Sequence, residues 1–213
     1  MIPLENYIDH TLLKPSATSQ NIIQLCKEAK SYNFFAVCIN GSFVRLAKRE
    51  LANSNIKIVA VVGFPIGASA TSIKVLETKT CINDGADEID MVINIGMLKS
   101  KDFKYVENEI LAVKNEVGNR VLKVIIETCY LTDEEKKVAC KLAMNAGADF
   151  VKTSTGFGSN GATTQDILLM KEVVKKQLKI KASGGISNKE TALNYISIGV
   201  SRIGTSSGIK IVT

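Results

Sequence analysis

The chain has 213 residues, 46% hydrophobic and 23% charged, and its 27 Lys and Arg against 21 Asp and Glu leave a formal charge of +6. This ordinary globular composition excludes a disordered or collagen-like chain, and one domain of this length buries roughly 70% of the surface that its unfolded chain exposes. Because His10 is the one histidine and the five cysteines form no CxxC pair, a zinc site built on paired histidines is excluded and metal-dependent functions are disfavoured.

Eight short runs, several of them apolar almost throughout, alternate with longer segments of helical periodicity. In chain order, the predicted strands cover residues 7–10, 35–39, 57–63, 88–93, 122–127, 150–154, 180–183 and 202–205. Continuous apolar runs such as IVAVV and KVIIE are typical of parallel strands that are buried on both faces. The sequence therefore predicts a parallel sheet.

Helix starts and ends lie between these strands. One helix begins at Ser19, and another follows a capping box that starts at Thr132. Gly85, Gly147 and Gly199 mark helix ends, and the phrases NDGADEID, NAGADFVK and SIGVSRIG each run from such an end into the next strand. These similar helix-to-strand connections indicate a βα unit that is repeated along the chain.

Eight strands with seven intervening helical segments predict an α/β fold, a single-domain (β/α)8 or TIM barrel over residues 1–213. The last helix is reduced to a short C-terminal stub at 207–213. An open doubly wound sheet has the same alternation, but no GxGxxG motif follows the first predicted strand.

Reactive groups in such a barrel lie at the C-terminal ends of the strands. The polar candidates there are Asp9, Asp90, Lys123, Glu127, Lys152 and Lys181. Lys152 stands out because it lies within a buried strand, in the run DFVKTSTGFG, where a lysine cannot easily reach water. Its alternative role is structural pairing with a carboxylate.

Lys181 lies on the next predicted strand after Lys152. Two neighbouring ammonium groups in a dry site depress each other's pKa, and a shift from about 10.4 toward about 7 corresponds to about 4 kcal/mol. One neutral amine then results, which is a nucleophile toward aldehydes and ketones. The pair therefore predicts Schiff-base chemistry.

Asp90 lies between Ile89 and Met91 in a buried strand, where a carboxylate needs a cationic or water partner. Two roles stay open for it: an internal salt bridge to a lysine, or a proton shuttle that acts with Lys181 on a bound water. Lys123 either joins the same charge cluster or lies on the exterior of the barrel.

Two glycine-rich segments, SGG at 183–185 and GTSSG at 204–208, follow the last two strands. Barrels bind phosphate in such loops, because backbone N–H groups without a neighbouring Cβ approach the anion closely. The hydroxyls of Ser206 and Ser207 can donate as well. Two such loops on adjacent strands predict a phosphorylated substrate.

These residues resemble the deoxyribose-phosphate aldolases, a family of class I aldolases with (β/α)8 barrels. The matching stretches, spread over residues 7–208, are YIDHTLLKP, AVCIN, VVGFPIGA, EIDMVINIG, KVIIET, FVKTSTGF, KASGGI and RIGTSSG. The resemblance implies a lyase of deoxyribonucleoside catabolism, which reversibly cleaves 2-deoxy-D-ribose 5-phosphate into D-glyceraldehyde 3-phosphate and acetaldehyde. It also implies that neither a metal nor a cofactor takes part.

The resemblance assigns three catalytic roles. It implies that Lys152 forms the Schiff base, that Lys181 perturbs this amine and takes part in proton transfer, and that Asp90 is the proton donor and acceptor. The substrate contacts that it implies are Gly184, Gly185, Ser206 and Ser207 for the phosphate, and Asp9 and Thr155 for a substrate hydroxyl.

Two features depart from the family pattern. Phe157 follows TSTG, where some members carry a lysine that reaches the substrate, so that contact is lost or replaced by backbone groups. The sequence stops at Ile211-Val212-Thr213, without the terminal tyrosine that some members use in proton transfer, which puts that route in doubt.

The alternative functions are another phosphate-binding barrel enzyme, such as a sugar-phosphate isomerase or a transaldolase-like enzyme, and a basic nucleic-acid-binding protein. Nucleic-acid binding is disfavoured because the lysines are spread along the chain without a basic block that interleaves aromatics. The N-terminus lacks a signal-peptide pattern, and no apolar run reaches the ~18 residues of a membrane helix. We expect a soluble cytoplasmic protein without nucleic-acid or membrane partners, and a homodimer from family habit.

Overall fold

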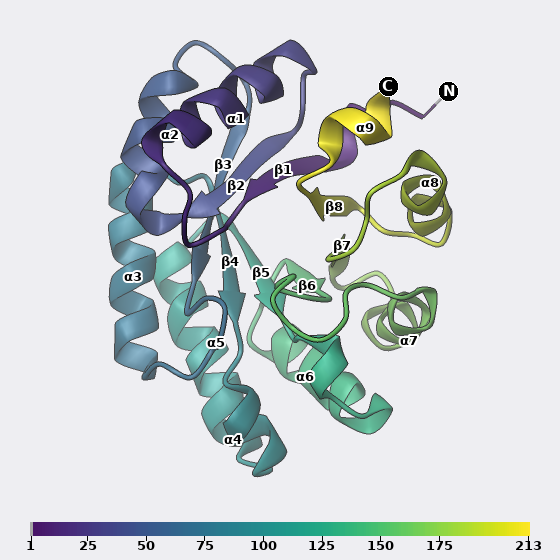
Figure 1. Cartoon of the computed structure of the whole chain (residues 1–213). Coiled ribbons are helices and arrows are strands. Elements are labelled where there is room, and N and C mark those ends of the chain that lie inside the picture. The colour runs from purple at the N-terminus through teal and green to yellow at the C-terminus, as the bar shows by residue number, and fades with distance from the viewer. Residues whose placement is uncertain (1) are drawn as a thin grey trace.

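Eight parallel strands close into a barrel in the computed structural model of the chain, which describes residues 2–213 (Figure 1). Each strand pairs with the next along the chain, and the eighth pairs back with the first. The strands are β1 (Ile8–Leu12), β2 (Ala36–Asn40), β3 (Lys57–Val62), β4 (Glu88–Val92), β5 (Val121–Ile125), β6 (Phe150–Lys152), β7 (Lys179–Ser183) and β8 (Arg202–Thr205). The predicted barrel is confirmed, and the closed pairing excludes the open doubly wound sheet.

Helices surround the strands on the outside of the barrel (Figure 1). They are α1 (Ser19–Ser31), α2 (Val44–Glu50), α3 (Thr71–Asp84), α4 (Ile95–Lys99), α5 (Phe103–Val117), α6 (Asp133–Asn145), α7 (Thr164–Val174), α8 (Lys189–Ser197) and α9 (Gly208–Val212), with short 3-10 helices η1 (Leu4–Tyr7), η2 (Gly41–Phe43) and η3 (Thr128–Tyr130). In α5, Val106, Ile110, Val113 and Val117 are buried at helical spacing, which is the pattern of a helix that packs on one face. The five residues of α9 confirm the expected stub.

The strand predictions are confirmed in order, and differences of two residues lie where β1, β5 and β6 end, with β1 reaching Leu12 and not residue 10. For β5 and β6 the sequence predicts strands to residues 127 and 154, whereas the strands end at Ile125 and Lys152. Glu127 has a left-handed backbone with φ 54°, which is incompatible with an extended strand. The residues after both strands therefore form loops at the C-terminal end of the barrel.

The predicted helix boundaries are confirmed by the local hydrogen bonds. At α6 the Thr132 hydroxyl accepts the Glu135 N–H at 3.3 Å, and the Glu135 carboxylate accepts the Thr132 N–H at 2.8 Å. Gly85 caps α3 in a left-handed conformation, and Gly147 and Gly199 follow the last turns of α6 and α8 with positive φ. These are the positions where a residue without Cβ stops a helix at least cost.

The interior of the barrel is divided into an apolar half and a charged half. Ala36 and Cys38 of β2, with Val59 and Val61 of β3 and the nearby Leu13, form a small apolar cluster that is separate from the large core between strands and helices. Buried charged side chains from β1 and from β4 to β8 occupy the other half. The ionisable groups are thereby gathered on one side of the interior.

A buried ion pair outside the barrel braces the end of β4. Lys74 of α3 and Glu109 of α5 are both fully buried, and the Lys74 Nζ lies 2.9 Å from Oε1 of Glu109. Lys74 also donates to the Val92 carbonyl at 2.8 Å, and Glu109 accepts the Asn94 N–H at 3.0 Å. Both helices are thus tied to the chain just beyond the strand that carries Asp90.

We expect Thr132→Ala to lower the free energy of unfolding by about 1 kcal/mol, because it removes the acceptor that caps α6. Urea unfolding measures this loss. Thr132→Ser keeps the hydroxyl and should stay within a few tenths of a kcal/mol of the wild type. Equal stability of the alanine and serine variants would contradict a role for the capping box.

Candidate active site

Seven charged side chains form one hydrogen-bonded cluster inside the barrel, here called the interior cluster. They are Asp9, Glu88, Asp90, Lys123, Lys152, Lys181 and Arg202, and each is at most 6% exposed. Strand register places them together: Asp90 pairs in register with Lys123, and Lys152 pairs with Lys181. Because alternate residues of a strand face the same side, these positions share the interior face.

Asp90 lies at the centre of the interior cluster. Its Oδ2 accepts from Lys152 Nζ and from Lys181 Nζ, both at 2.8 Å, and its Oδ1 accepts from Lys123 Nζ at 2.9 Å. Burial by itself raises the pKa of Asp90, but the three ammonium groups outweigh burial and hold the pKa well below its ordinary value. Asp90 is therefore an ionised carboxylate. Its Oδ2 is a shared acceptor for Lys152 and Lys181, the two lysines that the sequence predicts to be neighbours.

Lys181 is held between two carboxylates. Its Nζ lies 2.5 Å from Asp9 Oδ2 and 2.8 Å from Asp90 Oδ2. Burial lowers the pKa of Lys181, but the charges of Asp9 and Asp90 exceed that effect and raise the pKa above its ordinary value. Lys181 is therefore held in its protonated form.

The lower part of the interior cluster closes the N-terminal end of the barrel. Arg202 donates to Asp9 at 2.8 Å, and its guanidinium lies 3.5 Å from the centroid of the Phe35 ring. Lys123 lies 2.5 Å from Glu88, so this lysine faces the interior of the barrel. Of the two positions that the sequence allows for Lys123, the charge cluster is the correct one and the exterior is not. The sequence pattern does not single out Glu88 or Arg202 as candidate site residues. For Glu88 a usable signal exists, since it lies two positions before Asp90 and shares its face of the strand.

A cavity of about 530 Å³ opens above the interior cluster at the C-terminal ends of the strands, and we call it the mouth cavity. Its walls come from the loops after β1, β6, β7 and β8, and the lining residues are Thr11, Leu12, Leu13, Lys14, Lys152, Thr155, Gly156, Phe157, Ser183, Gly184, Gly185, Ile186, Ser187, Gly204, Thr205, Ser206 and Ser207. Of the interior cluster, Lys152 is the member that lines this cavity. The Lys152 amine therefore contacts the buried interior cluster and also faces the cavity in which a ligand fits.

The mouth cavity brings together most of the residues predicted to bind substrate. Thr155, both glycines of the SGG segment and both serines of GTSSG line it, whereas Asp9 lies beneath it within the interior cluster. Gly184 has φ +85°, and a Cβ there would stand 2.8 Å from the Cα of Gly161. The loops after β6 and β7 thus approach backbone to backbone, which only glycine permits at this position.

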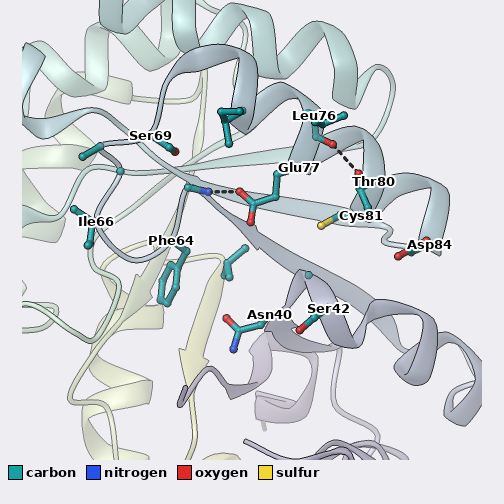
Figure 2. Close-up of a pocket in the computed structure, with 16 residues that line it drawn as sticks. Asn40, Ser42, Phe64, Ile66, Ser69, Leu76, Glu77, Thr80, Cys81 and Asp84 are labelled. Carbon is teal, nitrogen blue, oxygen red and sulfur yellow. Dashed lines mark hydrogen bonds between the residues drawn. The ribbon is translucent and has the colours of Figure 1, made fainter. Parts of the chain in front are cut away.

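A larger cavity of about 800 Å³ lies beside α3 and the loop after β3, and Figure 2 shows Phe64 and Ile66 on one side of it and Leu76 and Glu77 of α3 on the other. Its lining contains no member of the interior cluster. The Phe64 ring meets the Phe157 ring of the mouth cavity edge to face, with centroids 5.4 Å apart. The interior cluster thus opens to the mouth cavity through Lys152 and not to the larger cavity, and this aromatic pair stands between the two spaces.

The part of the chain that the structure describes contains no group of three or more His, Cys, Asp and Glu side chains that could hold a metal ion. Within that part, no helix has the length and apolar character needed to cross a membrane. The five cysteines are free thiols, and four of them are buried.

The chain is similar to known aldolases over almost its whole length. The sequence model of the DeoC/LacD family aldolases matches residues 5–211. Identity is 57% over 209 residues to the deoxyribose-phosphate aldolase of Finegoldia magna, covering 98% of both chains, and 56% over 214 residues to that of Thermococcus kodakarensis, covering 98% and 95%.

Solved structures show the same likeness. An aldolase called QR15 superposes with a TM-score of 0.96 at 42% identity, over 100% of this chain and 95% of that one. The deoxyribose phosphate aldolase of Aeropyrum pernix, described as tetrameric, gives a TM-score of 0.87 at 30% identity, over 98% and 89% of the two chains.

We expect the free energy of unfolding to fall as the pH is lowered below about 4. Burial raises the pKa of Asp9, but the charges of Lys181 and Arg202 outweigh burial and hold the pKa of Asp9 below its ordinary value. The cations around Asp90 lower the pKa of that carboxyl in the same way. Carboxyl groups with a depressed pKa stabilise the fold above their unfolded pKa and lose this contribution as the pH falls through the folded value. Lys181, whose pKa is raised, loses its contribution only above about 10.4.

Urea unfolding across the acid range measures this slope. Lys181→Met leaves two buried carboxylates short of a cation, so it should cost about 3–5 kcal/mol near neutral pH and give a shallower acid slope. Lys189→Met, a change at an exposed lysine, is the matched control and should reproduce the wild-type slope. Identical acid slopes in Lys181→Met and the wild type would show that the cluster does not set the pH dependence.

Proposed function

The chain belongs to the DeoC/LacD family of aldolases, and we propose that it acts as a class I deoxyribose-phosphate aldolase. It reversibly cleaves 2-deoxy-D-ribose 5-phosphate into D-glyceraldehyde 3-phosphate and acetaldehyde through a lysine Schiff base. The observation that carries the proposal is the Lys152 amine, which lines the mouth cavity and shares one oxygen of Asp90 with Lys181.

Lys152 is the nucleophile of the proposed reaction. A lysine adds to a carbonyl only as a neutral amine. Lys123 and Lys181 each contact two carboxylates in the depth of the barrel, and the raised pKa of Lys181 keeps it protonated. Lys152 has one carboxylate partner within residues 2–213, Asp90, and it is the amine that a substrate in the mouth cavity can reach.

The charge balance of the interior cluster favours one neutral amine. With every group ionised, the cluster holds four cations and three anions. An uncompensated charge in a buried site costs several kcal/mol. The proposed addition uses the neutral form of the Lys152 amine, and in that form the cluster holds three cations, each of which faces a carboxylate.

The proposed cleavage begins when the Lys152 Nζ adds to C1 of the open-chain sugar. Loss of water gives a protonated imine, whose positive nitrogen withdraws electrons. A base removes the proton of the C3 hydroxyl, the C2–C3 bond breaks, and its electron pair forms the enamine double bond between C1 and C2. Glyceraldehyde 3-phosphate leaves, with its new carbonyl at the former C3.

Asp90 and Lys181 then return a proton to C2. The Lys181 ammonium donates this proton, and the shared Asp90 oxygen, 2.8 Å from both amines, holds the donor beside the enamine. Water passes the proton taken from the C3 hydroxyl back to Lys181, so the cycle is balanced in protons. Hydrolysis of the resulting imine releases acetaldehyde and restores the Lys152 amine. The scheme uses neither a metal nor a cofactor, because the imine nitrogen serves as the electron sink.

The phosphate is proposed to lie against the glycine-rich loops of the mouth cavity. Backbone N–H groups around Gly184 and Gly185 and the hydroxyls of Ser206 and Ser207 supply donors, and Lys14 adds a positive charge on the cavity wall. Phe157 presents an aromatic ring beside them, so no lysine of that loop takes part.

Thr155 is proposed to bind a substrate hydroxyl from its place on the cavity wall. Asp9, for which the family resemblance also implies a hydroxyl contact, lies below the cavity and acts in this proposal by keeping Lys181 protonated. A cytoplasmic location and a homodimer, both expected from the sequence, complete the proposal.

We expect acetaldehyde and borohydride, added together in the presence of a chelator, to attach one reduced two-carbon group per chain. Peptide mass spectrometry should place this group on Lys152. Lys152→Met should carry no label and lose at least about 1,000-fold in cleavage, as expected when a covalent nucleophile is removed.

Lys14→Met is the matched control, since Lys14 lines the same cavity without joining the interior cluster. It should be labelled as the wild type is. A label on a different lysine, or full activity of Lys152→Met, would refute the assignment of the nucleophile.

We expect Ser207→Glu to raise the KM for 2-deoxyribose 5-phosphate by about 100-fold, because its carboxylate repels the phosphate. Unphosphorylated 2-deoxyribose serves as the control substrate, and its kcat/KM should change by less than about threefold. Steady-state kinetics with both substrates measure the difference. An equal loss with the two sugars would place the phosphate away from this loop.

A further inference from the structure

Glu127 is a buried carboxylate at the barrel mouth that the proposed reaction leaves without a role. It is 2% exposed and lies just beyond β5, two residues after Ile125. Of the five non-glycine residues with positive φ in the described part of the chain, Glu127 is the buried one, and the others are exposed. A left-handed backbone is unfavourable for a residue with a side chain and persists where its surroundings fix it.

The contacts that fix Glu127 lead to Thr155. The Glu127 carboxylate accepts the Thr155 backbone N–H at 3.2 and 3.3 Å, one distance for each oxygen, and it also accepts the Thr155 hydroxyl proton. The Thr155 Oγ1 in turn accepts the Phe157 N–H at 3.0 Å. The Glu127 side chain, on the loop after β5, therefore fixes both the backbone position and the hydroxyl orientation of Thr155, which lines the mouth cavity.

These bonds determine which way the Thr155 hydroxyl can act. A hydroxyl carries one proton and two lone pairs. The Thr155 hydroxyl donates its proton to Glu127, and one of its lone pairs accepts the Phe157 N–H. A single lone pair is therefore left to accept a hydrogen bond from the side of the mouth cavity. In this state Thr155 accepts a hydrogen bond from a ligand and cannot donate one.

We propose that Glu127 is a positioning residue that fixes Thr155 as an acceptor and thereby makes the site select a substrate hydroxyl. The inference rests on the proposed function, because it concerns the hydroxylated sugar phosphate that Lys152 cleaves. A carbonyl or ether oxygen offers no proton to Thr155, whereas a hydroxyl does. Acetaldehyde carries no hydroxyl, so its addition to Lys152 does not depend on Glu127.

A purely structural Glu127 would act differently. Gly158 packs against this region, where a Cβ would stand 2.6 Å from Cys129 Sγ and 3.3 Å from the Glu127 carboxyl carbon. If Glu127 only held this loop, its loss would lower stability and would impair sugar cleavage and acetaldehyde binding together. The two roles are therefore separated by comparing substrates with and without a hydroxyl.

Glu127→Gln is the decisive variant. The amide keeps the size of the side chain and an oxygen that accepts the Thr155 N–H, but its NH2 group replaces the acceptor of the Thr155 hydroxyl proton. That proton then turns toward the cavity and meets the proton of the substrate hydroxyl. We expect kcat/KM for 2-deoxyribose 5-phosphate to fall by about 10- to 100-fold, the range for losing a hydrogen bond to a charged group.

Borohydride trapping of acetaldehyde on Lys152 should stay within about twofold of the wild type in the same variant. Glu135→Gln is the matched control, because it makes the same change at a carboxylate that accepts a backbone N–H far from the cavity. It should leave both rates unchanged.

A double-mutant cycle shows whether Glu127 acts through Thr155. In a Thr155→Val background there is no hydroxyl to orient, so Glu127→Gln should lower kcat/KM by less than about threefold further. The proposal is overturned if the two losses multiply independently, if sugar cleavage is unchanged in Glu127→Gln, or if trapping falls as much as cleavage. A wild-type chain that forms no acetaldehyde adduct refutes the aldolase function itself, and this role with it.

Discussion

The structure depends on one carboxylate that has no access to water. Asp90 stays ionised in the barrel because the ammonium groups of Lys123 and Lys181, together with the Lys152 amine, converge on it. That convergence requires β4, β5, β6 and β7 to keep one register, since a slip by one residue would turn the side chains to the other face. Electrostatics and strand pairing therefore reinforce each other at the centre of the fold.

The apolar half of the interior strengthens this arrangement. The cluster around Ala36, Cys38, Val59 and Val61 is apolar apart from the Cys38 thiol, so the local dielectric is low and each ion pair is stronger than in water. The same environment penalises any charge without a partner. Lys152 lies at the edge of the cluster that faces the mouth cavity. When its amine reacts with a substrate, Asp90 still has Lys123 and Lys181 as cationic partners.

Much of this was predictable because polar residues that interrupt apolar runs are conspicuous. Lys152 and Asp90 each stand between apolar neighbours, so their strands and their burial follow from the sequence. Glu88 and Arg202 begin their strands, where a charged residue usually faces solvent, and only the closed barrel turns them inward. The conformation of Glu127 depends on Thr155, 28 residues away, and such a contact leaves no local pattern.

The stack of Arg202 on Phe35 has a consequence for how the site exchanges protons with its surroundings. With Phe150 also packed near the guanidinium, little open surface is left at the N-terminal end of the barrel, where Glu88 and Arg202 are at most 6% exposed, and Lys152 faces the mouth cavity at the other end. A ligand in the mouth cavity covers the Lys152 amine, because this amine lines the cavity wall. In the proposed reaction, a proton released at one stage then stays close to the same molecule for a later stage.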